Sequence, residues 1–225
     1  MKQLFLVTLA GSMLLLACNN SSNQTTTADS TGTSASPVTG APATPPATTS
    51  ADTAKGSDPW KQPMDDMMSQ MHSIQKTGDF DFDFANMMAA HHQGAIRMSE
   101  VESAQGKDEK MKSKAQEILT KQKEEQQKLQ DFVKSYKPSG MKHGEGELDK
   151  MMTDAMGKMQ NRHMSGDIDK DFATMMVDHH EHGIRMSKME QQYGMSSQLK
   201  QMAKKFIDDQ TKDIKEFRDW LKVHK

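Results

Sequence analysis

Methionine and histidine recur together at helical spacing in two parts of this sequence. In the first part, Met87 and Met88 each precede a histidine, His91 and His92, by four residues, and Met98 follows His91 after seven. Residues at these spacings lie on one face of an α-helix, so each thioether shares a face with an imidazole. Soft thioether ligands select Cu(I), with Ag(I) as its mimic, and imidazole suits copper in either oxidation state. The pattern therefore predicts a copper site.

The second part carries the same pattern with one more histidine. Its candidate ligands are Met175, Met176, His179, His180, His182 and Met186. Four of the six follow one another at i, i+4, i+7 and i+11 and share one helix face. A further candidate set lies upstream of each group and consists of Met68, Met71 and His72, and of Met156, Met159 and His163.

Core packing is the competing explanation for these methionines. Methionine is flexible and apolar, and it often fills helical cores without binding a ligand. A buried imidazole pair, however, costs desolvation and gives no packing that leucine would not give. Because adjacent histidines occur twice, each time with methionines on the same faces, we favour metal ligation.

Other chemistries fit the sequence less well. A single Cys excludes disulfides, Cys-based zinc sites and iron–sulfur clusters within one chain. Ferritin-like di-iron centres use Glu-x-x-His, a pattern that does not occur in this sequence. The sequence also lacks a recognisable nucleophile–base pair or carboxylate dyad, so we expect no enzymatic activity.

An internal duplication positions the two Met/His groups. From Met64 onward the sequence aligns with itself without gaps at an offset of 88. Each copy is typical of three helices, and no β-strand is expected. The expected helices cover about 59–77, 79–104 and 108–137, then 147–164, 168–192 and 196–223. Short loops would pair the long helices as antiparallel hairpins, which predicts an all-α four-helix bundle built from two tandem three-helix repeats.

Polar residues interrupt the apolar face of the third helix in each copy. Counting outward from the turn near Gly106 places His91 level with Gln122, and the second copy repeats this relationship. We hypothesise that the interrupting residues orient the imidazoles by hydrogen bonding, as partners of metal ligands commonly do. They are Gln122, Glu125, Gln210 and Asp213. The alternative is a solvated flank of the helix.

The N-terminal residues predict export and a lipid anchor. Residues 1–17 combine a basic start with an apolar run too short to span a bilayer. The segment Leu15–Cys18 resembles a bacterial lipobox, which implies a signal peptide over 1–17 and lipidation of Cys18; an ordinary signal peptide is the alternative. Residues 18–56, rich in Ser, Thr, Ala and Pro, are typical of a disordered tether. The folded part is then 57–225, with copies over about 57–140 and 145–225.

The Met/His segments also resemble a known family. The pattern Met-Met-x-x-His-His, followed by Gly or Ala and then Ile-Arg-Met, occurs over 87–98 and again over 175–186. It is similar to the bacterial family catalogued as domain of unknown function 305, across about residues 60–225. That resemblance implies a ferritin-like helical bundle in the cell envelope, and it associates some members with copper binding and copper tolerance. His182 replaces Gly94 of the first copy, so we expect the two sites to differ.

These observations lead to one expected function and two alternatives. We expect a copper-binding lipoprotein, outside the cytoplasm on the inner or outer membrane, that sequesters or transfers Cu(I), or Cu(II) or Ag(I), for homeostasis or tolerance. Its partners would be the metal ion, the membrane and copper-handling proteins. A formal net charge of −2 gives no argument for nucleic acid. The alternatives are a helical scaffold or partner-binding module with a Met-rich core, and an oxidant sink in which methionine cycles through its sulfoxide.

Overall fold

The computed structural model describes residues 58–142, 144, 146–160 and 163–224, without the side chains of 155–160. The predicted signal peptide, Cys18 and the tether lie outside the described residues. The described residues form six α-helices and no β-strand, which confirms the all-helical prediction. The helices are α1 (Lys61–Ser73), α2 (Phe80–Gln105), α3 (Glu109–Ser135), α4 (Glu147–Gln160), α5 (Ile168–Tyr193) and α6 (Ser197–Val223).

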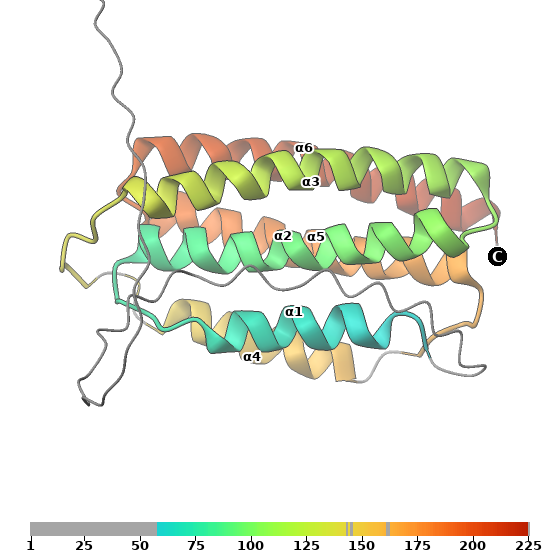
Figure 1. The fold of residues 1–225 in the computed structure, drawn as a ribbon, viewed down its shortest axis with the longest axis horizontal. Helices are drawn as coiled ribbons and strands as arrows, with labels where there is room; N and C mark the ends of the chain where they lie inside the picture. The colour runs from blue at the N-terminus through green and yellow to red at the C-terminus, as the bar shows by residue number, and fades with distance from the viewer. Residues whose placement is uncertain (1–57, 143, 145, 161–162, 225) are drawn as a thin grey trace, which may run out of the picture. The chain divides into compact units, whose positions relative to one another are not determined.

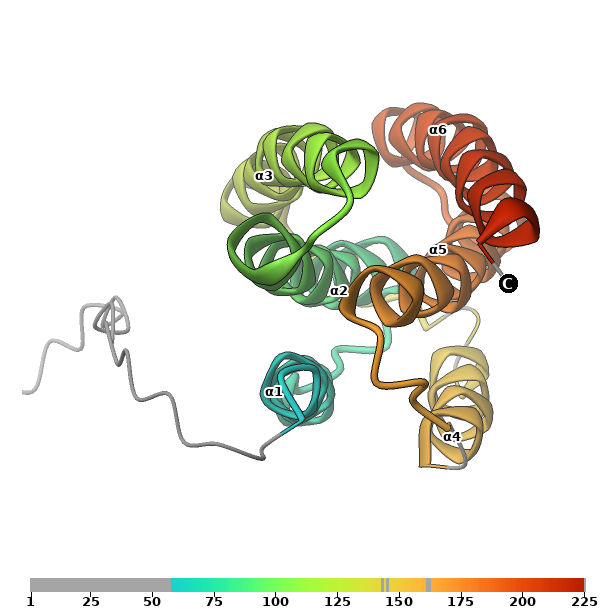
Figure 2. The same cartoon turned by 90° about the vertical axis from the view of Figure 1, so that its right-hand side faces the viewer.

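Four long helices surround the core. α2 pairs with α3 and α5 pairs with α6, and α2 also packs against α5. Figure 1 shows that α2 and α5 are antiparallel, and they pack side by side. In Figure 2, α1 and α4 lie on the side of α2 and α5 that faces away from α3 and α6. The bounds of α5 and α6 equal those of α2 and α3 shifted by 88 residues.

Side-chain caps fix where the long helices begin. In each case a side-chain oxygen of the capping residue accepts a backbone N–H three residues further on, which satisfies one of the free donors at a helix start. The capping residues are Asp79, Asp108, Asp167 and Ser196. The helix starts are therefore encoded locally in the sequence.

The turn before α2 explains why α1 is shorter than expected. α1 ends at Ser73, before the predicted end at residue 77. The Asp83 carboxylate accepts the backbone N–H groups of Thr77 and Gly78 at 2.8 and 2.9 Å and holds the chain in a turn. Gly78 has φ +85°, a conformation that favours glycine. Asp171 holds the turn before α5 in the same way.

Methionine fills much of the core. The six methionines predicted next to the histidine pairs are each at most 2% exposed: Met87, Met88, Met98, Met175, Met176 and Met186. They pack with buried aromatic side chains such as Phe84 and Phe172 in two apolar clusters. None of the helices in the described part of the chain combines the length and apolarity that a membrane span needs.

Candidate functional site

Three histidines meet where α2 crosses α5. The rings of His91 on α2 and His179 on α5 stack with centroids 3.7 Å apart and planes 24° apart. The His182 ring, one turn further along α5, lies 5.0 Å from that of His91. All three side chains are buried, with exposures of 1%, 5% and 7%. Two antiparallel helices thus bring imidazoles from both copies into one buried group, called here the histidine cluster (His91, His179 and His182).

Most ring nitrogens of the histidine cluster lack a partner. Within the described part of the chain, neither nitrogen of His91 has a hydrogen-bond partner, nor does His179 Nδ1 or His182 Nε2. Among the described atoms, the polar contact of these rings runs from His179 Nε2 to the backbone oxygen of His91, at 3.0 Å. A buried polar atom without a partner costs about 1–3 kcal/mol, and native proteins rarely keep several together without a reason. Packing alone therefore does not account for the cluster.

The cluster is held in the neutral form that metals bind. Burial lowers the pKa of His91 and His179 well below the ordinary value, and neighbouring histidines lower it further. Burial likewise lowers the pKa of His182 to about 4. At neutral pH each imidazole consequently keeps a lone pair, and no proton must leave before a cation binds.

His92 lies next to the carboxylate of Glu125, which in turn contacts a lysine. Glu125 Oε2 on α3 lies 3.3 Å from His92 Nε2. The other oxygen of Glu125 lies 3.0 Å from Lys205 Nζ on α6, whose side chain is 55% exposed. Burial raises the pKa of Glu125, but the contacts with His92 and Lys205 outweigh it and leave that pKa below its ordinary value. Glu125 is therefore a carboxylate at neutral pH. Its contact with His92 is electrostatic, since neither ring nitrogen of His92 has a hydrogen-bond partner among the described atoms.

His180 has an equivalent set of neighbours, a carboxylate and a lysine, and this lysine is buried. Asp213 Oδ2 on α6 lies 3.5 Å from His180 Nε2, and Asp213 Oδ1 lies 2.6 Å from Lys114 Nζ on α3. The Lys114 side chain is only 6% exposed. Burial raises the pKa of Asp213, but His180 and Lys114 outweigh it and hold that pKa well below its usual range. The two chains of groups are alike in order and differ in how far the lysine is shielded from water.

The predicted glutamines are buried at the depth of the histidines but do not contact them by hydrogen bonds. Gln122 and Gln210 are 2% and 1% exposed. Among the described residues, Gln122 Oε1 and both polar side-chain atoms of Gln210 lack hydrogen-bond partners. Gln210 packs against Gly183, where an added Cβ would lie 2.5 Å from its Oε1. The carboxylates of Glu125 and Asp213, by contrast, lie within 3.5 Å of His92 and His180.

The second candidate ligand set does not share the burial of the histidine cluster. His72 and His163 are exposed, whereas Met71 is buried and Met68 is half-buried. His72 Nδ1 lies 2.8 Å from the backbone oxygen of Met68. The side chains of Met156 and Met159 lie outside the described residues. These residues do not join the histidine cluster in a described contact.

In the described part of the chain, the carboxylate and histidine side chains do not form a metal chelate in their present rotamers. Over the described ranges, no three His, Cys, Asp or Glu side chains are arranged to hold a metal ion. The stacked rings of His91 and His179 keep their nitrogens in nearly parallel planes, so they do not converge on one point. A donor set built on the histidine cluster would have to include methionine sulfur or a rotated ring.

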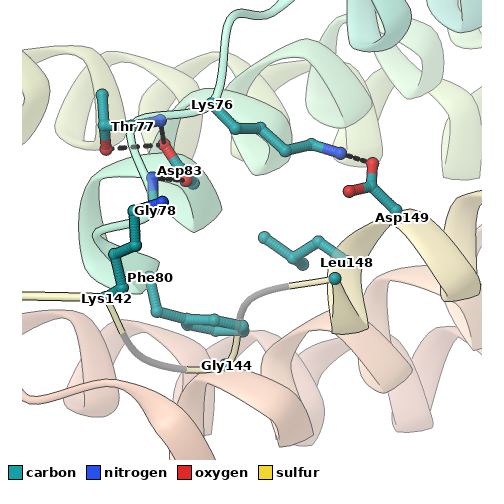
Figure 3. Close-up of a pocket in the computed structure, with 10 residues that line it drawn as sticks. Lys76, Thr77, Gly78, Phe80, Asp83, Lys142, Gly144, Leu148 and Asp149 are labelled. Carbon is teal, nitrogen blue, oxygen red and sulfur yellow. Dashed lines mark hydrogen bonds and ion pairs between the residues drawn. The ribbon is translucent and has the colours of Figure 1, made fainter.

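A cavity of about 140 Å³ opens elsewhere, next to the turn before α2. Figure 3 shows the Lys76 side chain reaching across it to Asp149 on α4, and Asp83 holding the turn on its other side. The residues that line it include Phe80 and Leu148, and none belongs to the histidine cluster. The walls of this cavity carry both lysines and carboxylates beside apolar side chains.

Two buried glutamates were not expected from the sequence. Burial and the neighbouring Asp169 raise the pKa of Glu102 to about 8. Burial and the neighbouring Asp81 raise the pKa of Glu190 to about 9. Each glutamate is 0% exposed, at the C-terminal end of its helix. Their positions differ by the repeat offset, four residues before Gly106 and Gly194, and this regularity was the available signal.

Comparison with known proteins places the chain among helical proteins of one family. The family described as domain of unknown function (DUF305) matches residues 19–133 and 133–221. The crystal structure of a "putative secreted protein DUF305" from Streptomyces coelicolor shares 19% identity and a TM-score of 0.53, over 66% of this chain and 95% of that one. A DUF305 fragment from Deinococcus radiodurans shares 15% identity and a TM-score of 0.50, over 64% and 96%. At these identities the likeness extends to the fold alone. No curated protein matches the chain.

Proposed function

We propose that this chain, which belongs to the DUF305 family, binds Cu(I) and sequesters or transfers it in the bacterial cell envelope. The observation that carries this proposal is the histidine cluster, where three buried and neutral imidazoles leave most of their nitrogens unpartnered. A soft cation would give these lone pairs the partner that the described protein atoms do not supply.

The donor chemistry around the cluster fits Cu(I) better than harder ions. Met87 and Met175 lie one helical turn before His91 and His179 on the same faces, and both thioethers are buried. The carboxylates of Glu125 and Asp213 are engaged by lysines and by the other histidine of each pair. Imidazole and thioether are therefore the groups left to ligate, and bound Cu(I) would supply storage or exchange of a soft cation rather than catalysis.

The finer description of the fold and location is part of the same proposal. We interpret the four long helices as a ferritin-like bundle made of two tandem three-helix repeats, supported by the 88-residue shift between helix bounds. We place the domain outside the cytoplasm, held to a membrane through lipid on Cys18. The secreted description of the Streptomyces coelicolor relative is compatible with export.

The burial of methionine disfavours the oxidant sink. A sink needs thioethers that meet oxidants in solvent. Among described methionines, the strongly exposed ones are Met141 and Met195, at 56% and 65%. The remaining alternative, a helical scaffold with a Met-rich core, predicts well-satisfied packing and leaves the unpartnered imidazoles unexplained.

An anaerobic titration of the full chain with Cu(I), in competition with a chromogenic chelator, tests the proposal. We expect tight binding in the wild type and loss of that ion in His91→Ala/His179→Ala, with helix content by circular dichroism unchanged. The matched control is His72→Ala, which removes an exposed histidine and should keep the ion. Equal binding by all three proteins would reject the cluster as a copper site.

A further inference from the structure

A second group of soft donors lines a cavity at the N-terminal end of α5. This cavity, of about 260 Å³, lies where the segment before α5, the first turns of α5 and the end of α6 meet. Four of its lining residues carry an imidazole or a thioether: His163, Met164, Met175 and His224. We call it the C-terminal pocket. Lys170 and Asp171 add one charge of each sign, and the Asp171 carboxylate is occupied by the turn before α5.

The tautomer of His224 leaves a lone pair available. Its Nδ1 lies 2.8 Å from the backbone oxygen of Trp220. A carbonyl oxygen only accepts, so Nδ1 carries the proton and donates. In the neutral ring Nε2 then carries the lone pair; its nearest charged neighbour is Asp108 Oδ2, at 3.9 Å. A backbone carbonyl behind Nδ1 is the usual arrangement of a metal-binding histidine. Stacking on Trp220, with centroids 4.0 Å apart, fixes the ring plane.

Met175 connects the C-terminal pocket with the histidine cluster. It lines the pocket, yet its side chain is only 2% exposed, so it forms the inner wall. It also lies one helical turn before His179, on the same face of α5. The exposed His163, the inner Met175 and the buried His179 thus form a series of soft donors that runs from solvent inward.

The first copy has no equivalent series. At the offset of 88, Gln75 replaces His163, Lys76 replaces Met164 and Tyr136 replaces His224. Lys76 is ion-paired with Asp149 (Figure 3). The first copy thus lacks both imidazoles and the thioether that line the outer part of the pocket, so the soft-donor pocket belongs to the second copy.

We propose that the C-terminal pocket is a solvent-accessible Cu(I) site that loads the histidine cluster through Met175. The ion moves by ligand exchange, from His163 and His224 to the Met175 thioether and then to His179, and it keeps its charge and oxidation state throughout. Binding in the pocket stands on its own residues. The transfer step rests on the proposed function of the histidine cluster.

Anaerobic Cu(I) titration of the full chain against a chromogenic chelator separates the two claims. We expect His163→Ala/His224→Ala to lose one bound ion per chain, and His91→Ala/His179→Ala to keep that ion while losing the cluster ion. Gln75→Ala, at the first-copy position equivalent to His163, is the control and should bind as the wild type does. Stopped-flow loading should be at least several-fold slower in Met175→Leu than in Met87→Leu, which removes the equivalent thioether of the first copy but no residue that lines the pocket; both changes nearly conserve side-chain volume.

Three results would overturn the inference or its transfer step. If His163→Ala/His224→Ala binds as many ions as the wild type, the pocket is not a copper site. If that variant loses an ion but Met175→Leu loads the cluster at the wild-type rate, the pocket binds without transferring. A wild-type ion count in His91→Ala/His179→Ala would instead reject the cluster, and with it the transfer step, while leaving the pocket ion to be counted separately.

Discussion

The imidazole rings of His91 and His179 stack 3.7 Å apart although 88 residues separate them in sequence. They occupy the same position in the two copies, and their helices run antiparallel. A residue of an antiparallel repeat meets its own copy only near the midpoint of the pair. The 88-residue offset between the two Met/His segments therefore sets one histidine against its equivalent, in a buried cluster that one segment alone could not form.

Replacing His91 with leucine should make the metal-free protein more stable and abolish cluster binding. Both His91 nitrogens are buried and unpartnered among the described atoms, so removing them should raise the free energy of unfolding by about 1–3 kcal/mol. Urea denaturation of metal-free His91→Leu measures this, with His72→Leu as the exposed control. A loss of stability would show that the imidazole serves packing.

The two buried carboxylates should differ in their dependence on lysine. Lys114→Met leaves Asp213 charged in the core and should destabilise the protein by about 3–5 kcal/mol. Lys205→Met removes the lysine that contacts Glu125, and because Lys205 is 55% exposed we expect a loss of less than about 1 kcal/mol. Chemical denaturation of both variants at pH 7 compares them. Equal losses of stability in the two variants would contradict the expectation that the buried Lys114 contributes more than the exposed Lys205.

The helices could be predicted because their signals are local. The acidic or serine caps and the glycines at 106 and 194 fix the ends of α2, α3, α5 and α6 within a residue or two of the expected bounds. α1 was overextended because its end depends on Asp83, a residue of the next helix that draws Thr77 and Gly78 into a turn. Such a contact has no signal in helical periodicity.

The site was predictable in residue type and only partly in arrangement. Repeat register and helical spacing pointed to the histidines and to polar residues at the same depth. They could not distinguish Glu125, which contacts His92, from Gln122, whose Oε1 has no hydrogen-bond partner among the described atoms, because one turn of helix separates the two residues. Nor could they reveal the C-terminal pocket, since His224 and His163 meet there from distant parts of the chain.

Stability of the metal-free protein should peak near pH 6.5. Four buried histidines have lowered pKa values in the folded protein. Below pH 6.5 the unfolded chain therefore binds more protons at these histidines than the folded chain does, so the free energy of unfolding falls as pH falls. They are His91, His179, His180 and His182. Above pH 6.5 the raised pKa values of Glu102 and Glu190 act in the opposite direction. Thermal melts from pH 5 to 9 measure the profile, and a monotonic rise would contradict it.

The loss of stability on the alkaline side should disappear when the two buried glutamates are replaced by glutamine. In the wild type, Glu102 and Glu190 keep their protons up to about pH 8 and 9, whereas the unfolded chain releases them near pH 4.5. Each glutamate then lowers the free energy of unfolding by up to about 1.4 kcal/mol per pH unit as pH rises between those values. Glutamine has nearly the same shape and no proton to lose.

We therefore expect Glu102→Gln/Glu190→Gln to match the wild type near pH 5 and to exceed its stability at pH 8. Urea denaturation at both pH values measures the difference. Glu100→Gln is the control, because Glu100 is an exposed residue of the same helix whose partner, Lys123, is also half exposed. If the double variant lost stability with pH as steeply as the wild type does, the two carboxyl groups would be ionised in the folded protein, and their burial beside Asp169 and Asp81 would need another source of compensation.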